Sequence, residues 1–432
     1  MRSKPLALMA LGLALPALAQ TLSVNEAIQS ALAQNPRIQA AQAGTDAASA
    51  QASQARWDRI GRLELGALWA PDVRNPQVGF PGAPPAFPPF RFDLALQRRN
   101  NLELSYVQPL WTWGALAGRV KAASLQTAAS ADLAAREKEL VRFEATQRFL
   151  QALQAAEAVK VAELALAQQL AFQATARARV AEGVAPRLDV LKADLAVSQA
   201  ESDLITLRNR ARISREELAA VTRDERFRQL PLAPVEDPSG DLPAEAACLQ
   251  QARDRRLDLK SLTRQVSALR TSARAERASG LPSLDFQASW TQRSDQLGNL
   301  GETLNRTSLV GLAIRWEGLA PKRARARSAD FEARARQREA QAASLEDQLA
   351  VEVRTARWKV EDARAQTTVA GRALNQAEER ARVSRVAYRA GTTTAVEAED
   401  AELALSQARY QVLATRLEAG IAWAALEFSI GQ

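Results

Sequence analysis

Residues 179–200 read RVAEGVAPRLDVLKADLAVSQA, and they place a glycine between two helical patterns. The segment before Gly183 is rich in alanine, and the segment after it continues as a second helix. Glycine reaches a positive φ without a Cβ clash, so it lets the chain reverse direction where a helix ends. The stretch therefore predicts a helical hairpin with its tip at Gly183.

A related stretch occurs near the end of the chain. A shift of 391 − 183 = 208 positions aligns Gly183 with Gly391, and the Ser-Gln-Ala that follows each glycine aligns as well. A shift of 290 − 69 = 221 positions aligns Trp69 with Trp290. The sequence therefore predicts an internal two-fold repeat.

Apolar residues recur every seven positions after both glycines. A seven-residue period forms the seam of a left-handed coiled coil, so we expect these helices to pack lengthwise on neighbouring helices. The seam residues are Val190, Val197, Leu204, Ala211 and Leu218 in the first copy and Leu405, Val412, Ala419 and Leu426 in the second.

The 432-residue composition excludes several kinds of enzyme. There is no histidine and only one cysteine, Cys248, so one chain cannot form a serine-histidine triad, a cysteine-histidine pair or a histidine-bearing zinc site. Carboxylate chemistry stays open as a third interpretation, but no paired carboxylates stand out beyond the helices. We expect no enzymatic activity, no cofactor and no metal, and we expect Cys248 to be a buried structural thiol.

The net charge is +8. Basic and acidic residues are interleaved, as in Arg136-Glu137-Lys138-Glu139, which is typical of solvated helix faces with ion pairs between successive turns. The alternative is a basic coiled-coil scaffold that binds nucleic acid or an anionic surface. That alternative leaves the pattern of a signal peptide in residues 1–19, four alternating segments and the aligned tryptophans unexplained, so we expect no nucleic-acid partner.

Residues 1–19 have the pattern of a secretory signal peptide. Arg2 and Lys4 precede an apolar run over 5–18, and a small-x-small site predicts cleavage near Ala19/Gln20. No later stretch reaches the roughly 20 apolar residues that a spanning helix needs. An exported chain of this kind can cross a membrane only as strands.

Four segments alternate between apolar and mostly polar residues, which predicts strands over 62–70, 100–110, 283–291 and 307–316. The proline-rich residues 71–99 predict a long exposed loop without a ladder. Around these strands we expect a first repeat over 20–222, with a helix from Ser23 to about Ala55 broken near Pro36, a long helix 115–182, a tip at 183 and a helix 187–222. An equatorial linker follows over 223–241. The second repeat would cover 242–432, with a helix 243–278, a long helix 321–390, a tip at 391 and a helix 395–428.

This order resembles the outer membrane efflux protein (TolC-like) family. The residues that carry the resemblance are Leu22-Ser23-Val24-Asn25-Glu26-Ala27 with Asn35-Pro36, Pro109-Leu110-Trp111, the tip glycines, and Leu188-Asp189-Val190-Leu191-Lys192-Ala193. The resemblance implies a mainly α fold with a small β part. It also implies a homotrimer in which four strands per chain close a transmembrane β-barrel that is continuous with a long α-helical coiled-coil barrel.

The resemblance further implies a passive outer membrane exit duct for a tripartite efflux or type I secretion system. Its implied location is the outer membrane, with a long periplasmic extension. The implied partners are a periplasmic adaptor (membrane fusion) protein, an inner membrane transporter and outer membrane lipid.

The family pattern also implies site residues. The periplasmic gate would include Glu397 and Asp400, although both could instead favour the start of their helix. The tips that dock the adaptor would be Gly183, Val184, Ala185, Gly391, Thr392 and Thr393, although the glycines could serve only to turn the chain. The lipid-facing barrel residues would be Leu63, Leu65, Trp69, Leu104, Phe286, Trp290, Leu312, Ile314 and Trp316. The lumen-facing residues would include Glu64, Glu103, Asp285 and Arg315.

Overall fold

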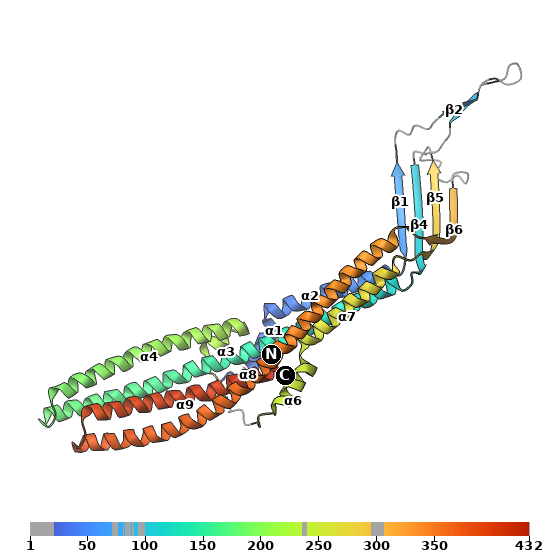
Figure 1. Ribbon diagram of the computed structural model, residues 1–432. Helices are drawn as coiled ribbons and strands as arrows, with labels where there is room; N and C mark the ends of the chain where they lie inside the picture. The colour runs from blue at the N-terminus through green and yellow to red at the C-terminus, as the bar shows by residue number, and fades with distance from the viewer. Residues whose placement is uncertain are drawn as a thin grey trace, which may run out of the picture. The chain divides into compact units, whose positions relative to one another are not determined.

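A computed structural model describes residues 21–70, 77–80, 82, 88, 90–93, 100–235, 240–294 and 306–431. The predicted signal peptide lies outside these residues. The elements, labelled in Figure 1, are α1 (Val24–Gln34), α2 (Pro36–Trp57), β1 (Arg62–Trp69), β2 (Gln77–Phe80), β3 (Phe90–Asp93), β4 (Asn100–Trp111), α3 (Ala115–Ala181), α4 (Arg187–Thr222), α5 (Arg226–Gln229), α6 (Glu245–Arg255), α7 (Leu257–Ala278), β5 (Ser283–Ser294), β6 (Arg306–Arg315), α8 (Ala320–Ala390) and α9 (Ala395–Ser429).

The chain divides into two compact units. One, the helical unit, comprises residues 1–40, 135–257 and 346–432. The other, the sheet unit, comprises residues 41–134 and 258–345. The long helices α3 and α8 contribute residues to both units.

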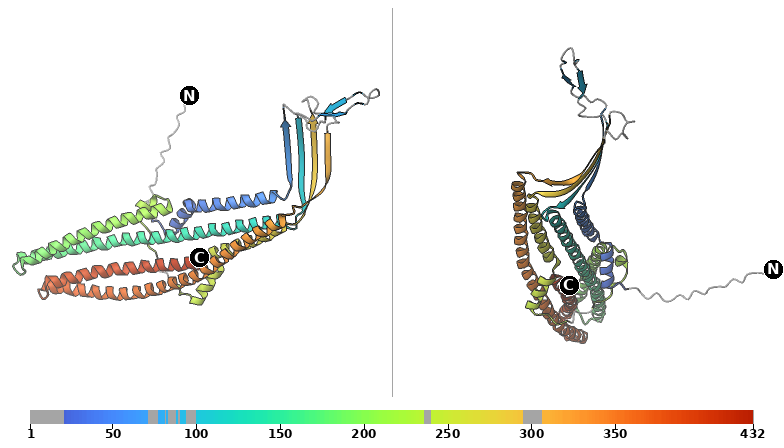
Figure 2. Two further views of the ribbon diagram at one scale, coloured as in Figure 1. Left: turned by 45° about the horizontal axis from the view of Figure 1, so that its top comes forward. Right: turned by 90° about the vertical axis from the view of Figure 1, so that its right-hand side faces the viewer.

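The sheet unit contains an antiparallel sheet with the strand order β1-β4-β5-β6 (Figure 2). Its register places Leu65 opposite Leu104, and Leu104 opposite Trp290 on the next strand. Within the described residues, β1 pairs only with β4 and β6 only with β5. Both outer strands therefore present an open edge in the single chain.

The prediction of an unpaired loop over 71–99 was wrong in part. Residues 77–80 and 90–93 form an antiparallel ladder, with Val78 paired to Phe92 and Phe80 to Phe90. Each strand has only four residues, so the Val-Gly-Phe and Phe-Arg-Phe alternations are too short to stand out among the prolines. The rest of the predicted loop lies outside the described residues.

In the helical unit, α3 and α4 lie side by side, as do α8 and α9 (Figures 1 and 2). α3 has 67 residues, which corresponds to about 100 Å at a rise of about 1.5 Å per residue. A helix of that length needs lengthwise partners to bury its apolar side chains. The predicted seam residues Val197, Leu204, Leu218, Leu405 and Leu426 are indeed buried.

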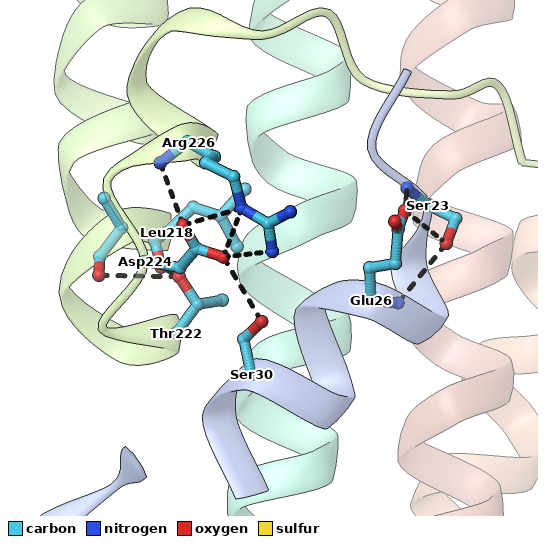
Figure 3. A network of polar contacts seen from close by, with 8 residues as sticks. Ser23, Glu26, Ser30, Leu218, Thr222, Asp224 and Arg226 are labelled. Atoms are coloured by element: carbon cyan, nitrogen blue, oxygen red, sulfur yellow. Dashed lines mark hydrogen bonds and ion pairs between the residues drawn. The ribbon is translucent and has the colours of Figure 1, made fainter. Parts of the chain in front are cut away.

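The start of α1 is fixed by a network of polar contacts (Figure 3). Ser23 and Glu26 form a complete capping box at the start of α1, which the Ser-x-x-Glu spacing predicted. Asp224, just beyond α4, accepts hydrogen bonds from the Arg226 guanidinium (2.7 Å) and from the Ser30 hydroxyl (3.4 Å). The Arg226 guanidinium is the main reason why the pKa of Asp224 is lowered. These contacts attach α1 to the end of α4.

The helix predicted over 243–278 is broken at Arg256, which separates α6 from α7. Arg256 is almost completely buried, and its Nη1 donates to Ser429 O (3.2 Å) and lies 3.1 Å from Glu352 Oε2. Arginine is not a helix breaker, so contacts with α8 and the end of α9 account for the break. The linker 223–241 also contains α5, and the backbone of Leu22 pairs with the linker at Leu232.

Among the described helices, none combines the length and the apolar character that crossing a membrane requires.

We predict that Cys248 reacts slowly with thiol reagents. Its side chain is buried on α6, and burial raises the pKa of the thiol, so little thiolate is available. Maleimide labelling in the native protein should be at least about tenfold slower than in denaturant. Labelling of the exposed variant Ser198→Cys in a Cys248→Ala background provides the control. Equal rates for native and denatured Cys248 would contradict the prediction.

Candidate functional site

The first candidate site is one face of the sheet. Residues paired across strands lie on the same face, so the register extends the face of Leu65 through Leu104 and Trp290. Phe286 pairs with Leu312 on the same face. All the predicted lipid-facing residues within the strands lie on this face: Leu63, Leu65, Trp69, Leu104, Phe286, Trp290, Leu312 and Ile314. Trp316 continues the same alternation just beyond β6.

This apolar sheet face is open to solvent in the single chain. Leu65 is 73% exposed and Ile314 is 78% exposed, although large aliphatic side chains are normally buried in a core. Contiguous exposed apolar surface marks a protein or membrane interface. The opposite face carries Glu64, Glu103, Asp285 and Arg315, and Arg315 Nη2 lies 3.6 Å from Asp285 Oδ2. The sheet therefore separates an apolar surface from a polar one.

The second candidate site is the pair of tips. Gly183 has φ +75° and Gly391 has φ +77°. At the first tip, Val184 N–H donates to Arg179 O (3.0 Å), and at the second Thr392 N–H donates to Ala387 O (2.9 Å). With the accompanying bond from each glycine N–H, both tips are Schellman motifs. The two hairpins therefore end in the same backbone geometry.

A set of contacts that we call the tip clamp joins the two hairpins. Arg179 of α3 donates from Nη1 to Tyr388 O on α8, and its guanidinium carbon lies 4.5 Å from the centre of the Tyr388 ring. The ring of Phe172 also packs against the Tyr388 ring, with centroids 5.0 Å apart. Tyr388 is only 2% exposed, and burial raises the pKa of its hydroxyl. Sequence patterns did not identify the tip clamp, because its partners are about 209 residues apart.

The predicted gate acids lie three residues apart at the start of α9. Glu397 N–H donates to Thr394 Oγ1 (3.3 Å), which caps the helix, and the Glu397 carboxylate accepts from the Thr393 hydroxyl. The Thr393 hydrogen bond, helped by the backbone of Thr394, lowers the pKa of Glu397. Glu397 is thus an ionised helix-capping residue, and Asp400 is exposed one turn later. The contacts of Glu397 at the start of α9 are enough to explain an acidic residue at this position, without a role in a gate.

Asp400 also borders a groove of about 810 Å³ between α3, α4 and α9, which we call the hairpin groove. Burial raises the pKa of the neighbouring Glu399 carboxyl, and the charge of Asp400 adds to this effect. No lysine or arginine is among the described residues that line it. The side chains that line the hairpin groove include Leu195, Leu207, Leu403 and Tyr410 together with Asp203, Glu399 and Asp400. The hairpin groove therefore combines apolar side chains with an acidic border.

A buried carboxylate on α9 was also missed. Glu402 is 4% exposed, and its Oε1 lies 2.9 Å from Nε of Arg385 on α8. Burial is the main reason why the pKa of Glu402 is raised. Among the described residues, no group of histidine, cysteine, aspartate or glutamate side chains is placed to hold a metal ion.

The sequence profile described as "Outer membrane efflux protein" matches residues 27–222 and 248–432. The chain belongs to the outer membrane efflux protein family. The match includes both tips, the sheet and the helices that carry them. Members of this family are outer membrane channels and not enzymes, in agreement with the absence of catalytic motifs from the sequence.

Solved structures of outer membrane channels share this fold. VceC from Vibrio cholerae is 18% identical, with a TM-score of 0.78 over 94% of this chain and 96% of that one. CusC is 18% identical, with a TM-score of 0.79 over 96% of this chain and 95% of that one. The open state of the Neisseria gonorrhoeae MtrE channel is 17% identical, with a TM-score of 0.73 over 94% and 88%. A comparison with curated protein sequences finds no match.

Membership of the efflux family gives the two candidate sites a common context. The family supports an efflux role and an outer membrane location with a periplasmic extension.

Proposed function

We propose that three copies of this chain form a passive exit duct of a tripartite efflux or type I secretion system. An inner membrane transporter and a periplasmic adaptor would supply substrate and energy. Four strands from each copy would close one barrel, and the helices would continue it as a hollow periplasmic cylinder. The observation that carries this proposal is the exposed apolar face of a sheet with two open edges.

The open edges argue for closure by several chains. An unpaired backbone N–H or C=O group in lipid costs several kcal/mol, and β1 and β6 each leave a row of such groups. Four strands are too few to close a barrel within one chain. Pairing β6 of one copy with β1 of the next removes both edges at once, because the two edges belong to opposite sides of the same sheet.

Exposed apolar residues on the helices also favour association of copies. On α8, Val351 is 63% exposed and Trp358, seven residues later, is 54% exposed. On α4, Leu188 and Leu195 are 56% and 71% exposed at the same spacing. A seven-residue apolar stripe normally contacts a neighbouring helix. Helices of adjacent copies would cover these stripes in a trimer.

For the mouth of the duct, we propose that three copies of Glu397 and Asp400 narrow the entrance and favour cations. The adaptor would dock at Gly183, Val184, Ala185, Gly391, Thr392 and Thr393. The exposed positions of Gly183, Val184, Gly391 and Thr392 support this placement. A glutamate is already ionised at neutral pH, and the lowered pKa of Glu397 extends its charged range to more acidic pH.

Three measurements test the proposed function as a whole. The mature protein should require detergent, have the mass of a trimer, and open water-filled channels in a planar lipid bilayer. A monomer that stays soluble without detergent would overturn the proposal. Binding to DNA that weakens steeply with salt would favour the basic-scaffold alternative instead.

A variant with Glu397→Ala and Asp400→Ala tests the gate. We expect its cation preference to fall by about twofold or more, because six carboxylates leave the mouth of a trimer. Single-channel reversal potentials in a salt gradient measure this preference. The control pair Glu378→Ala and Glu379→Ala removes the same charge from α8, away from the start of α9. An unchanged preference would leave Glu397 and Asp400 as residues that only favour the helix start.

A further inference from the structure

The net positive charge of the chain is not evenly distributed. The sheet unit has 24 Lys and Arg against 16 Asp and Glu, a net charge of +8, whereas the helical unit has 33 of each and is neutral. Ion pairs between interleaved basic and acidic residues account for the neutral net charge of the helical unit, but not for the positive net charge of the sheet unit. Most of the excess lies on α7 and on the part of α8 in this unit, which together have 12 Lys and Arg against 5 Asp and Glu.

Part of this excess lies where helices meet strands. Two tryptophans bind the turn between α7 and β5: Trp113 Nε1 donates to Pro282 O (2.8 Å), and Trp316 Nε1 donates to Gly280 O (3.3 Å). Gly280 lies so close to α8 that a Cβ there would be 2.9 Å from the Cβ of Ala324. The end of α7 and the start of α8 are therefore held together beside Trp316.

At this junction a cavity of about 350 Å³ is lined by Arg277, Gly280, Leu281, Pro321 and Arg325. Arg325 is exposed, and Lys322 lies three residues earlier, on the same side of α8. The lining residue Leu281 is 48% exposed, and Leu319, just before the start of α8, is 65% exposed. Cationic and apolar groups are thus exposed next to each other.

The start of α8 concentrates positive charge. Lys322, Arg323, Arg325 and Arg327 lie within its first two turns, and its first turn has no acidic residue. The first N–H groups of a helix are already positively polarised, so these cations repel both the helix end and one another. Arg323 and Arg327 have carboxylate partners in Glu317 and Glu276. Lys322 and Arg325 have no ion pair among the described residues, so an external anion would stabilise this end.

We propose that the junction of α7 and α8 binds the phosphate group of an anionic phospholipid through Lys322 and Arg325. Arg277, whose guanidinium is paired with Glu332 on α8, lies beside them. The lipid chains would lie along Leu281, Leu319 and Trp316, and from there along the apolar sheet face. Trp316 follows the alternation of Ile314, so the site is continuous with the face that we propose to meet lipid. The inference rests on the proposed function, because it requires the sheet to be in a membrane.

A similar combination occurs at the other edge of the sheet. Arg56 and Arg59, at and just beyond the end of α2, line a cavity of about 580 Å³ together with Ile60 and Tyr106. Trp57 beside them is 68% exposed and Ile60 is 55% exposed. Arginine beside exposed aromatic and aliphatic residues therefore occurs near β1 and near β6. In a closed barrel the two groups would form a belt around the strand–helix boundary.

Quenching of tryptophan fluorescence by brominated lipids tests the inference, because Trp316 lies beside the proposed site. The full-length mature protein is reconstituted in vesicles with brominated phosphatidylglycerol or brominated phosphatidylcholine at matched amounts. A lysine or arginine near a membrane surface contributes about 1 kcal/mol, or about fivefold, to the binding of anionic lipid. We expect a clear preference for phosphatidylglycerol that falls at least about fivefold in the variant with Lys322→Gln and Arg325→Gln.

The control variant, with Arg372→Gln and Arg380→Gln, removes two exposed arginines from the helical unit and should keep the preference. Inorganic phosphate should not abolish it beyond the effect of sodium chloride at equal ionic strength. Equal quenching by both lipids in the wild type, an equal loss in the control, or displacement by inorganic phosphate would each overturn the inference. Flotation with the vesicles is measured separately, and protein that does not float would contradict the proposed function itself.

Discussion

The variant Leu65→Arg is expected to reduce insertion into the outer membrane at least about tenfold. Leu65 lies in the middle of β1, pairs with Leu104 and is 73% exposed on the apolar sheet face. A cationic side chain facing lipid near the middle of a barrel costs about 2–4 kcal/mol, and a trimer would carry three of them. The trimer recovered from the outer membrane, measured by its resistance to dissociation in mild detergent, reports the effect.

The adjacent variant Gly66→Arg is the matched control. It introduces the same side chain at nearly the same depth of the sheet but on the polar face, opposite Glu103. A Cβ at Gly66 would meet nothing closer than 4.0 Å, so the strand can accept the larger residue. We expect Gly66→Arg to insert at close to the wild-type level. Equal loss in both variants, or normal insertion of Leu65→Arg, would contradict a lipid-facing role for this surface.

The placement of Leu65 and Gly66 on opposite faces of the sheet could be predicted, because the alternation of side chains along a strand is a local property. Alternation in four separate segments defined one apolar face, and the register joined those segments, with one irregularity between Pro109 and Trp111 at the end of β4. The helical hairpins could also be predicted, since the turn glycine, whose φ is positive, and the seven-residue apolar period both lie within short stretches of chain. Local patterns of this kind need no knowledge of the rest of the molecule.

Features that depend on distant contacts could not be predicted. The chain breaks between α6 and α7 at Arg256 because a buried guanidinium must reach Ser429 O and Glu352, and no local signal marks that position. The gate acids were predicted from the family pattern, by counting from Gly391, and stay a prediction, whereas the buried Glu402 five residues beyond Glu397 was not predicted. Its burial depends on Arg385 of the facing helix.

The tip clamp is the most consequential of these distant contacts, and the variant Arg179→Ala is expected to raise the open probability of the reconstituted channel about tenfold or more. A hydrogen bond from a charged donor contributes about 1.5–3 kcal/mol, and a cation–π contact adds about 0.5–2 kcal/mol. Each 1.4 kcal/mol lost from the clamped arrangement changes a two-state equilibrium about tenfold. Single-channel recording in planar bilayers measures the open probability directly.

The expected direction follows from what the tip clamp connects. Arg179 belongs to the first hairpin and Tyr388 to the second, so the contact opposes any motion that separates their tips. Widening a mouth built from these tips requires such a motion, because the φ of each glycine fixes the geometry within its own hairpin. Arg177→Ala is the control, since Arg177 pairs with Asp194 inside the first hairpin and does not reach the second. If Arg177→Ala opened the channel as much as Arg179→Ala, loss of a nearby charge would explain the effect, and the tip clamp would have no role in holding the hairpins together.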